Sequence, residues 1–227
     1  MDTIELPDTL FAAPCTICIA GPSGSAKTCI AFEILKYRQQ LFSQPVAGAV
    51  YFYSEMQDMF RNNPPPDVKF HHGMPSEDEI ERYIDSFDGQ HFLFLFDDLM
   101  SQGSQSTLMQ DIATKLSHHR NFSTITINQN IFQSGKTART QSLNSQYFLL
   151  SRTCRDVRQI GTLGSQLFPG KGSKFIQLYK EAVDTSLREG EIPFLFINCH
   201  PFRGVRGCQL LSSIFPPGGA MLLWKLE

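Results

Sequence analysis

Two short groups of residues in this chain have the side-chain types and spacing needed to bind a phosphate and a divalent cation. The first is the glycine- and serine-rich segment Gly21-Pro-Ser-Gly-Ser-Ala-Lys-Thr28, which follows an apolar, β-rich stretch and precedes a segment with helical spacing. The second is the pair Asp97-Asp98, which ends the apolar run 92–96. Each group stands at the end of an expected strand, so the strands must bring the two groups together.

The first segment matches the phosphate-binding loop pattern G-x-x-x-x-G-K-[ST] at every defined position except one. Small residues let backbone N–H groups surround phosphate oxygens, and the start of the following helix adds the positive end of its dipole. Lys27 is expected to contact the β- and γ-phosphates of ATP, and the Thr28 hydroxyl to bind Mg²⁺. The expected nucleotide-binding residues are Gly21, Pro22, Ser23, Gly24, Ser25, Ala26, Lys27, Thr28 and Cys29.

The departure from the pattern is Ala26, which stands where the pattern has glycine. Its side chain is a single methyl group, so we expect the loop to tolerate it if residue 26 has a negative φ. An ordinary Gly/Ser turn before a helix is the alternative interpretation of the whole segment.

The acidic pair indicates that a metal ion accompanies the bound phosphate. A buried strand that ends in two carboxylates is costly unless a cation compensates their charge, and Mg²⁺ would do so. Asp97 is expected to hold the metal, through water, and Asp98 to polarise the attacking water, a role often taken by Glu. A solvated strand end is the alternative. Together with the loop, the pair predicts Mg²⁺-dependent hydrolysis of ATP.

Alternating strands and helices must position these groups. Strands are expected at 15–20, 49–54, 92–96, 123–128, 146–150 and 193–198, and helices at about 27–42, 76–87, 104–119, 156–168 and 173–184. This alternation predicts an α/β fold with a mainly parallel sheet flanked by helices. We expect a single domain over 1–227, with a core at about 12–169 and a C-terminal extension of the sheet at about 170–227.

The strand at 49–54 comes between the loop and the acidic pair in the sequence. It indicates a P-loop NTPase of the RecA-like type, with an inserted strand between the phosphate-binding and acidic strands. Such proteins place a polar sensor at the end of the next strand, where Asn128-Gln-Asn130 stands. We favour Gln129 as the residue that reads the γ-phosphate; capping of the strand end is the alternative.

Composition limits the possible partners. The chain has 227 residues, 41% of them hydrophobic, and a net charge of −2, which indicates a globular protein without a strongly basic surface. Any contact with DNA must be local, or must come from a ring that concentrates basic residues in its pore. Neither a secretory signal nor a membrane span is expected. Cys15 and Cys18 lie in an apolar run without a second CxxC motif, so we expect buried, reduced thiols.

Several further patches carry a family resemblance. They are the stretch Ser117–Ser145, in particular its Gln-Asn-Ile-Phe and Ser-Leu-Asn-Ser parts, together with Arg155-Asp156, Gln159-Ile160 and Leu167-Phe-Pro169. With the loop and the acidic pair, this stretch of about 15–169 resembles the poxvirus-type genome-packaging ATPases of the FtsK/HerA superfamily. These ATPases occur in large DNA viruses, virophages and Polinton-like elements.

The resemblance implies a homo-oligomeric ring of five or six subunits that drives double-stranded DNA into a capsid, with capsid or vertex proteins as partners. It also implies an arginine finger that reaches the nucleotide of a neighbouring subunit, for which Arg139 and Arg120 are the candidates. The expected location is the host nucleus, a cytoplasmic virus factory or the virion, and not the secretory route. The alternatives are a related DNA pump, a helicase-like ATPase of the same superfamily, or a weakly hydrolysing nucleotide-binding assembly protein.

Overall fold

A computed structural model describes residues 2–5, 9–99, 120–132, 144–201, 208–215 and 220–226. In chain order its elements are β1 (Asp2–Glu5), β2 (Thr16–Ala20), α1 (Lys27–Lys36), α2 (Arg38–Leu41), β3 (Ala49–Tyr53), α3 (Asp58–Asn62), β4 (Val68–His72), α4 (Glu77–Ser86), β5 (Phe92–Asp97), β6 (Phe122–Asn128), β7 (Tyr147–Ser151), α8 (Val157–Leu167), α9 (Gly172–Arg188), β8 (Phe194–Asn198), β9 (Gln209–Ser212) and β10 (Ala220–Trp224).

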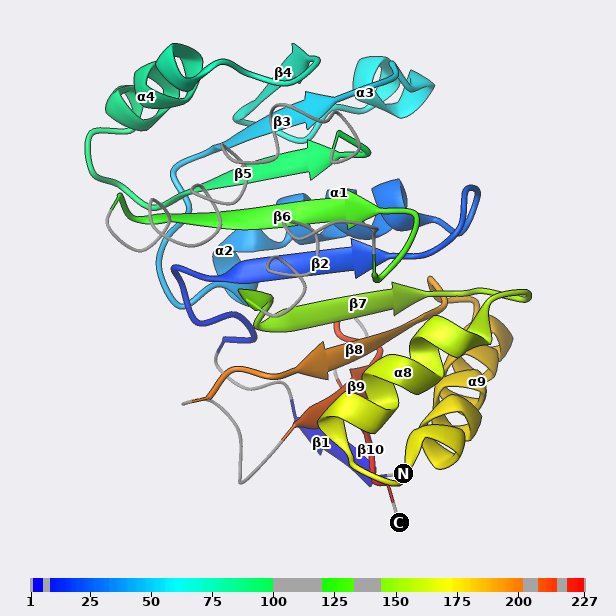
Figure 1. The fold of residues 1–227 in the computed structure, drawn as a ribbon. Helices are drawn as coiled ribbons and strands as arrows, with labels where there is room; N and C mark the ends of the chain where they lie inside the picture. The colour runs from blue at the N-terminus through cyan, green and yellow to red at the C-terminus, as the bar shows by residue number, and fades with distance from the viewer. Residues whose placement is uncertain are drawn as a thin grey trace.

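The strands of the described residues form one ten-stranded sheet in the order β1-β10-β9-β8-β7-β2-β6-β5-β3-β4 (Figure 1). The strands from β7 to β4 are parallel to their neighbours. The strands from β8 to β1 are antiparallel to theirs. The predicted fold class, an α/β fold with a mainly parallel sheet flanked by helices, is confirmed.

A strand does separate the phosphate-binding strand from the acidic strand, and that strand is β6. It pairs with β2 on one side and with β5 on the other. The strand at 49–53, which suggested the insertion because it intervenes in the sequence, lies on the far side of β5 as β3. The C-terminal ends of β2, β6 and β5 therefore lie side by side, and the segments that follow these strands meet at one edge of the sheet.

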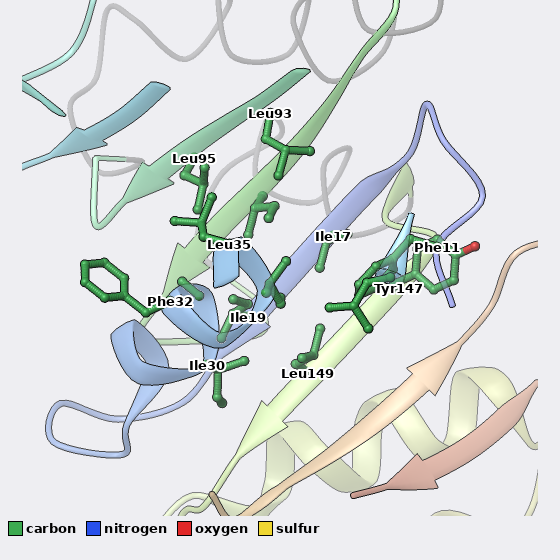
Figure 2. Close-up of a cluster of buried hydrophobic side chains, with 14 of the residues drawn as sticks. Phe11, Ile17, Ile19, Ile30, Phe32, Leu35, Leu93, Leu95, Tyr147 and Leu149 are labelled. Carbon is green, nitrogen blue, oxygen red and sulfur yellow. The ribbon is translucent and has the colours of Figure 1, made fainter. Parts of the chain in front are cut away.

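Helices cover both faces of the sheet, with α1 and α2 on one face and α8 and α9 on the other (Figure 1). Strand β2 serves both layers because its side chains alternate. Ile17 and Ile19 pack in the cluster that includes Leu35 of α1, whereas Cys18 and Ala20 pack in the cluster with α8 and α9 (Figure 2). This burial on both faces explains why β2 reads as a continuous apolar run.

The other elements agree with the sequence to different degrees. Helix α4 begins with the expected capping box, in which Ser76 Oγ accepts from Glu79 N at 3.3 Å and Glu79 Oε2 accepts from Ser76 N at 2.8 Å. The helix expected at about 27–42 is interrupted at Tyr37, whose φ of −100° and ψ of 14° separate α1 from α2. The helix expected at 104–119 lies outside the described residues.

The sequence analysis did not predict β1, β4, β9 or β10. These strands are short, and β1 and β4 form the two edges of the sheet. Strand β4, Val-Lys-Phe-His-His, has no buried residue and so lacks the apolar run of a central strand. Among the described residues, no helix combines the length and apolar character required to cross a bilayer.

Candidate functional site

The loop between β2 and α1 has the close packing expected of a segment built from small residues. A Cβ atom at position 21 would lie 2.1 Å from Ser151 Oγ, so any larger residue would have to displace the Ser151 side chain. Gly24 has a φ of 75°, which glycine adopts without strain. Ser25 Oγ donates to Pro22 O at 2.7 Å and lies 2.9 Å from Ser151 Oγ, so the end of β7 supports the loop from one side.

Ala26 has a φ of 65° and a ψ of 23°, which is the left-handed region. The expectation of a negative φ at this position is therefore wrong, because the turn into α1 requires the conformation that the glycine of the pattern would adopt freely. For alanine this conformation costs about 1–2 kcal/mol. No side chain caps α1 at this end, so the amide groups of its first turn are free to bind an anion.

Lys27 and Thr28 are the first two residues of α1, directly after the loop. Lys27 Nζ donates to Pro22 O at 2.9 Å, so the ammonium group folds back over the loop. Burial lowers the pKa of Lys27, while the negative charges of Asp97 and Asp98 act to raise it. The two predicted groups thus interact electrostatically across the edge of the sheet.

Asp97 ends β5 as a buried carboxylate with one fixed oxygen. The Tyr51 hydroxyl, on the neighbouring strand β3, donates to Asp97 Oδ2 at 2.8 Å. Burial and the neighbouring Asp98 raise the pKa of Asp97, whereas the Tyr51 hydrogen bond and Lys27 lower it. A carboxylate that is costly to ionise in this position would be stabilised by a bound cation.

Asp98 and Gln129 come together at the ends of β5 and β6. Gln129 Nε2 donates to Asp98 Oδ2 at 2.7 Å. Asp98 has a φ of 54°, and its backbone N–H donates to Ile127 O at 3.0 Å, which anchors the turn to β6. Among the described residues, the second oxygen of Asp98 has no hydrogen-bonding partner.

A cavity of about 660 Å³ joins these groups. Its lining residues are Ser23, Gly24, Ala26, Lys27, Thr28, Cys29, Ser54, Glu55, Gln57, Met59, Asp97, Asp98 and Gln129. The Thr28 hydroxyl and the Asp97 carboxylate supply oxygen donors, which are the ligands that Mg²⁺ prefers. These residues therefore fit a magnesium ion and the phosphates of a nucleotide.

Sequence reasoning missed two residues near Asp97. Tyr51 lies in β3, and Glu55 lies in the segment that follows β3. Tyr51 is buried inside an apolar strand and resembles an ordinary core residue. Glu55 is exposed at the rim of the cavity and forms no hydrogen bond or ion pair with the described residues. The signal that could have found both is their position, because the strand beside the acidic strand ends at the same edge of the sheet as the cavity.

Gln159 and Asp156, which the sequence analysis named only as part of the family resemblance, fix the segment that follows Gln129. Gln159 Oε1 accepts from the backbone N–H groups of Ile131 at 2.9 Å and Phe132 at 3.2 Å. Gln159 Nε2 donates to Asn130 Oδ1 at 3.1 Å and to Asp156 Oδ2 at 3.0 Å. Because Asp156 is also the N-cap of α8, this one amide ties the predicted sensor segment to the start of that helix.

A cavity of about 380 Å³ lies on the other side of the loop. It is lined by Pro22, Ser23, Gly24, Ser25, Ala26, Arg152, Thr153, Cys154, Arg155, Leu187 and Pro193. Three of these loop residues, Ser23, Gly24 and Ala26, also line the first cavity. A ligand held by the loop could therefore extend from one cavity into the other.

The two candidate arginine fingers are not part of this arrangement within the described chain. Arg120 lies just before β6, and its Nη2 is 3.5 Å from Glu81 Oε2 on α4. The cavity stands at the opposite end of β6, where Gly21 N donates to Asn128 O at 3.1 Å. Arg120 therefore does not approach the cavity of its own chain. Arg139 lies outside the described residues.

Comparison with known proteins yields no match to a family model and none to a curated protein. Among solved structures, the chain is similar to the genome packaging NTPase B204 from Sulfolobus turreted icosahedral virus 2 in complex with sulfate. The TM-score is 0.51 and the identity 8%, over 94% of this chain and 98% of that chain. The same NTPase in complex with ATP-gammaS gives a TM-score of 0.45 at 7% identity, over 94% of this chain and 98% of that chain.

A further solved structure, the cytoplasmic domain of EssC, matches with a TM-score of 0.47 and 11% identity over 69% of this chain. The chain spans 35% of the length of that domain. The likeness to B204 is one of fold, and it agrees with the P-loop ATPase type of fold that the sequence predicts.

Proposed function

We propose that this chain is a Mg²⁺-dependent ATPase that moves double-stranded viral DNA into a capsid. The observation that carries the enzymatic part is the meeting of the loop, Lys27, Thr28, Asp97 and Asp98 at one cavity. These residues come from two segments that are distant in the sequence and that follow β2 and β5, the two strands on either side of β6.

Each group has a role in phosphoryl transfer. The loop amides and Lys27 bind the β- and γ-phosphates, while Thr28 and Asp97 hold the metal ion. When bound, Mg²⁺ offsets the negative charge that develops on the phosphates. The Tyr51 hydrogen bond keeps one oxygen of Asp97 in place.

The attacking water belongs beside Asp98. This carboxylate accepts the proton of the water as the new bond to the γ-phosphorus forms, and the hydrogen bond from Gln129 orients it. Gln129 is in addition placed to sense the γ-phosphate, because it lines the same cavity. Loss of that phosphate would free Gln129 to change its partner.

The second cavity is suited to the nucleoside. Leu187 and Pro193 offer apolar surface for a base, and Leu187 is 41% exposed, although large apolar side chains are usually buried. Arg152 and Arg155 line the same cavity and can stack on a base or contact ribose hydroxyls. The loop between the two cavities would then hold the phosphates.

The motor part of the proposal rests on two likenesses. The B204 structure, whose name describes genome packaging, matches nearly the whole of both chains in fold. The sequence resembles the packaging ATPases at Gln129–Phe132 and at Arg155-Asp156. Gln129 lines the first cavity and Arg155 lines the second. The proposal includes a homo-oligomeric ring with an arginine finger from Arg139 or Arg120. It also includes capsid or vertex proteins as partners and a location in the nucleus, the virus factory or the virion.

Steady-state hydrolysis of ATP, with and without linear duplex DNA, tests the proposal. We expect hydrolysis that DNA stimulates and that falls about 100-fold or more in both Lys27→Ala and Asp98→Asn. Lys36→Ala is the matched control, because Lys36 is an exposed lysine at the other end of the same helix, where it contacts Glu33 at 3.6 Å and the Tyr37 ring. Nucleotide binding without turnover, unchanged by DNA, would instead support the assembly protein.

Two further measurements separate the remaining alternatives. Mass determination in the presence of an ATP analogue and DNA is expected to detect a closed ring, and a persistent monomer would contradict the arginine-finger mechanism. Unwinding of a forked duplex would favour the helicase-like ATPase over a packaging motor.

A further inference from the structure

Two cysteines outside the proposed nucleotide site lie in contact with each other. Cys199 Sγ and Cys208 Sγ are 3.2 Å apart and flank the connection between β8 and β9. The last paired residues of the two strands are Asn198 and Gln209, so the cysteines are directly opposite at the next position of the ladder. Both side chains are partly exposed.

The backbone at this position has the geometry that a disulfide requires. Cys199 N donates to Gln146 O at 2.8 Å, next to β7. In a strand, the N–H and C=O groups of one residue point to the same side, so Cys199 turns toward Cys208 as a non-hydrogen-bonded pair. In such pairs the Cα atoms are about 4.5 Å apart, within the range of about 4.4–6.8 Å found for disulfides.

Neighbouring contacts hold this register. Asn198 Nδ2 donates to Gln209 Oε1 at 3.2 Å, and His200 N donates to Asn198 Oδ1 at 3.0 Å. The His200 ring stacks on Tyr147 of β7, with ring centroids 5.9 Å apart. Bond formation therefore needs only a small movement of the two sulfur atoms.

The other four cysteines do not form such pairs. Burial raises the pKa of Cys15 to about 12 and that of Cys18 to about 11, so both stay protonated in the core. Cys154 is exposed, and Cys29 is partly buried in the loop cavity. All six cysteines lie in the described part of the chain, and of these only Cys199 and Cys208 have sulfur atoms within hydrogen-bonding distance.

We propose that Cys199 and Cys208 form a reversible intrachain disulfide, with a low-molecular-weight disulfide of the glutathione class as the oxidant. This assignment does not depend on the proposed ATPase activity. It concerns the antiparallel part of the sheet, at the end of β8 that is remote from the nucleotide loop (Figure 1).

The chemistry is a pair of thiol–disulfide exchanges. The Cys199 thiolate attacks one sulfur of the oxidant, forms a mixed disulfide and releases the first thiolate of the oxidant. The Cys208 thiol then loses its proton and attacks the Cys199 sulfur, which forms the intrachain bond and releases the second thiolate. Two protein thiols are oxidised, the oxidant is reduced to two thiols, and these take up the two protons.

The contact with Cys199, followed by burial, raises the pKa of Cys208. Within the proposal, Cys199 is assigned as the attacking residue and Cys208 as the residue that resolves the mixed disulfide, and the Cys208→Ser variant below tests this order.

The test treats the reduced full-length chain with oxidised glutathione, blocks remaining thiols with N-ethylmaleimide, and identifies linked peptides by mass spectrometry. We expect a Cys199–Cys208 linked peptide, its loss on treatment with dithiothreitol, and a rise of the Tm by about 5 °C in the oxidised form. The affinity for nucleotide should be the same in both forms.

Variants make the outcome decisive. Cys208→Ser should stop at a glutathione adduct on Cys199, whereas the matched control Cys154→Ser should form the linked peptide normally. Cys208→Ala serves the same purpose if the serine variant fails to fold. Absence of the linked peptide at every ratio of oxidised to reduced glutathione, or equal glutathione adducts on both cysteines, would overturn the proposal.

Discussion

Ala26 shows how a single backbone angle limits the phosphate loop. Its φ of 65° places a methyl group where the loop pattern has glycine, in a conformation that is costly for alanine. The close packing at Gly21 and the contact between Ser25 and Ser151 nevertheless hold the loop in the phosphate-binding shape. Ala26 therefore lowers the stability of the loop without changing its shape.

We expect Ala26→Gly to stabilise the protein by about 1 kcal/mol, because glycine adopts this conformation without the steric cost. Urea denaturation measures this change, and the affinity for ATP should be retained or increased. Ala31→Gly is the contrasting substitution: Ala31 lies inside α1, where glycine should destabilise the protein by about 1 kcal/mol. A loss of stability in Ala26→Gly would contradict the left-handed conformation.

Tyr51 gives the site a dependence on pH. Its hydroxyl lowers the pKa of Asp97, and burial raises it. Removing the hydroxyl in Tyr51→Phe leaves the effect of burial and raises the pKa of Asp97 further. Because Asp97 must be ionised to hold a cation, the acidic limb of the hydrolysis profile should move to higher pH, with weaker binding of Mg²⁺.

The measurement is the pH dependence of kcat/KM at several Mg²⁺ concentrations. Tyr53→Phe is the matched control, since Tyr53 lies on the same face of β3 and its hydroxyl has no hydrogen-bonding partner among the described residues. An unchanged acidic limb in Tyr51→Phe would show that the hydrogen bond does not act on the ionisation of Asp97.

At the scale of elements, Gln159 connects β6 to α8. Its amide group makes four hydrogen bonds, two of them to backbone N–H groups of the segment that follows Gln129. The position of Gln129 beside Asp98 therefore depends on Gln159, a residue of α8. Through the same contacts, a displacement of Gln129 on phosphate release would be transmitted to the start of α8.

For Gln159→Ala we expect a loss of about 2 kcal/mol in the free energy of unfolding, because two backbone donors lose their acceptor. The kcat should fall about tenfold with little change in KM, since the variant loosens Gln129 without touching the phosphate loop. Gln159→Glu keeps an acceptor for the two N–H groups and should recover part of the stability.

Gln166→Ala, an exposed position on the same helix, is the control and should change neither quantity. A fall in stability without any change in kcat would assign Gln159 a structural role alone.

At the scale of the whole molecule, the two ends of β6 lie at opposite edges of the sheet. Gln129 and the nucleotide cavity stand at one end, and Arg120 stands at the other. Arg120 could therefore act only on the nucleotide of a second subunit, as a ring would allow.

Of Arg120→Ala and Arg139→Ala, we expect one to lower kcat about 1,000-fold without weakening nucleotide binding. The measurement is hydrolysis at protein concentrations that permit assembly, with Arg82→Ala as a control for loss of an exposed arginine on α4. Mixing the inactive variant with Lys27→Ala subunits should restore part of the activity, because one supplies the finger and the other the nucleotide site. Full activity in both arginine variants would exclude both candidates.

Local patterns in the sequence determined much of this site. The loop of small residues before Lys27-Thr28, the acidic end of the run 92–96 and the polar end of the next strand each carry their own signal, because the chemistry restricts residue type at neighbouring positions. The central strands were also predictable, since burial on both faces requires continuous apolar runs.

Only the tertiary structure decided the rest. The place of β6 between β2 and β5, the Tyr51 bond to Asp97, the Gln159 contacts and the meeting of Cys199 with Cys208 each depend on segments brought together by the fold. No local pattern encodes them, because strand order and side-chain contacts arise from packing over long sequence separations.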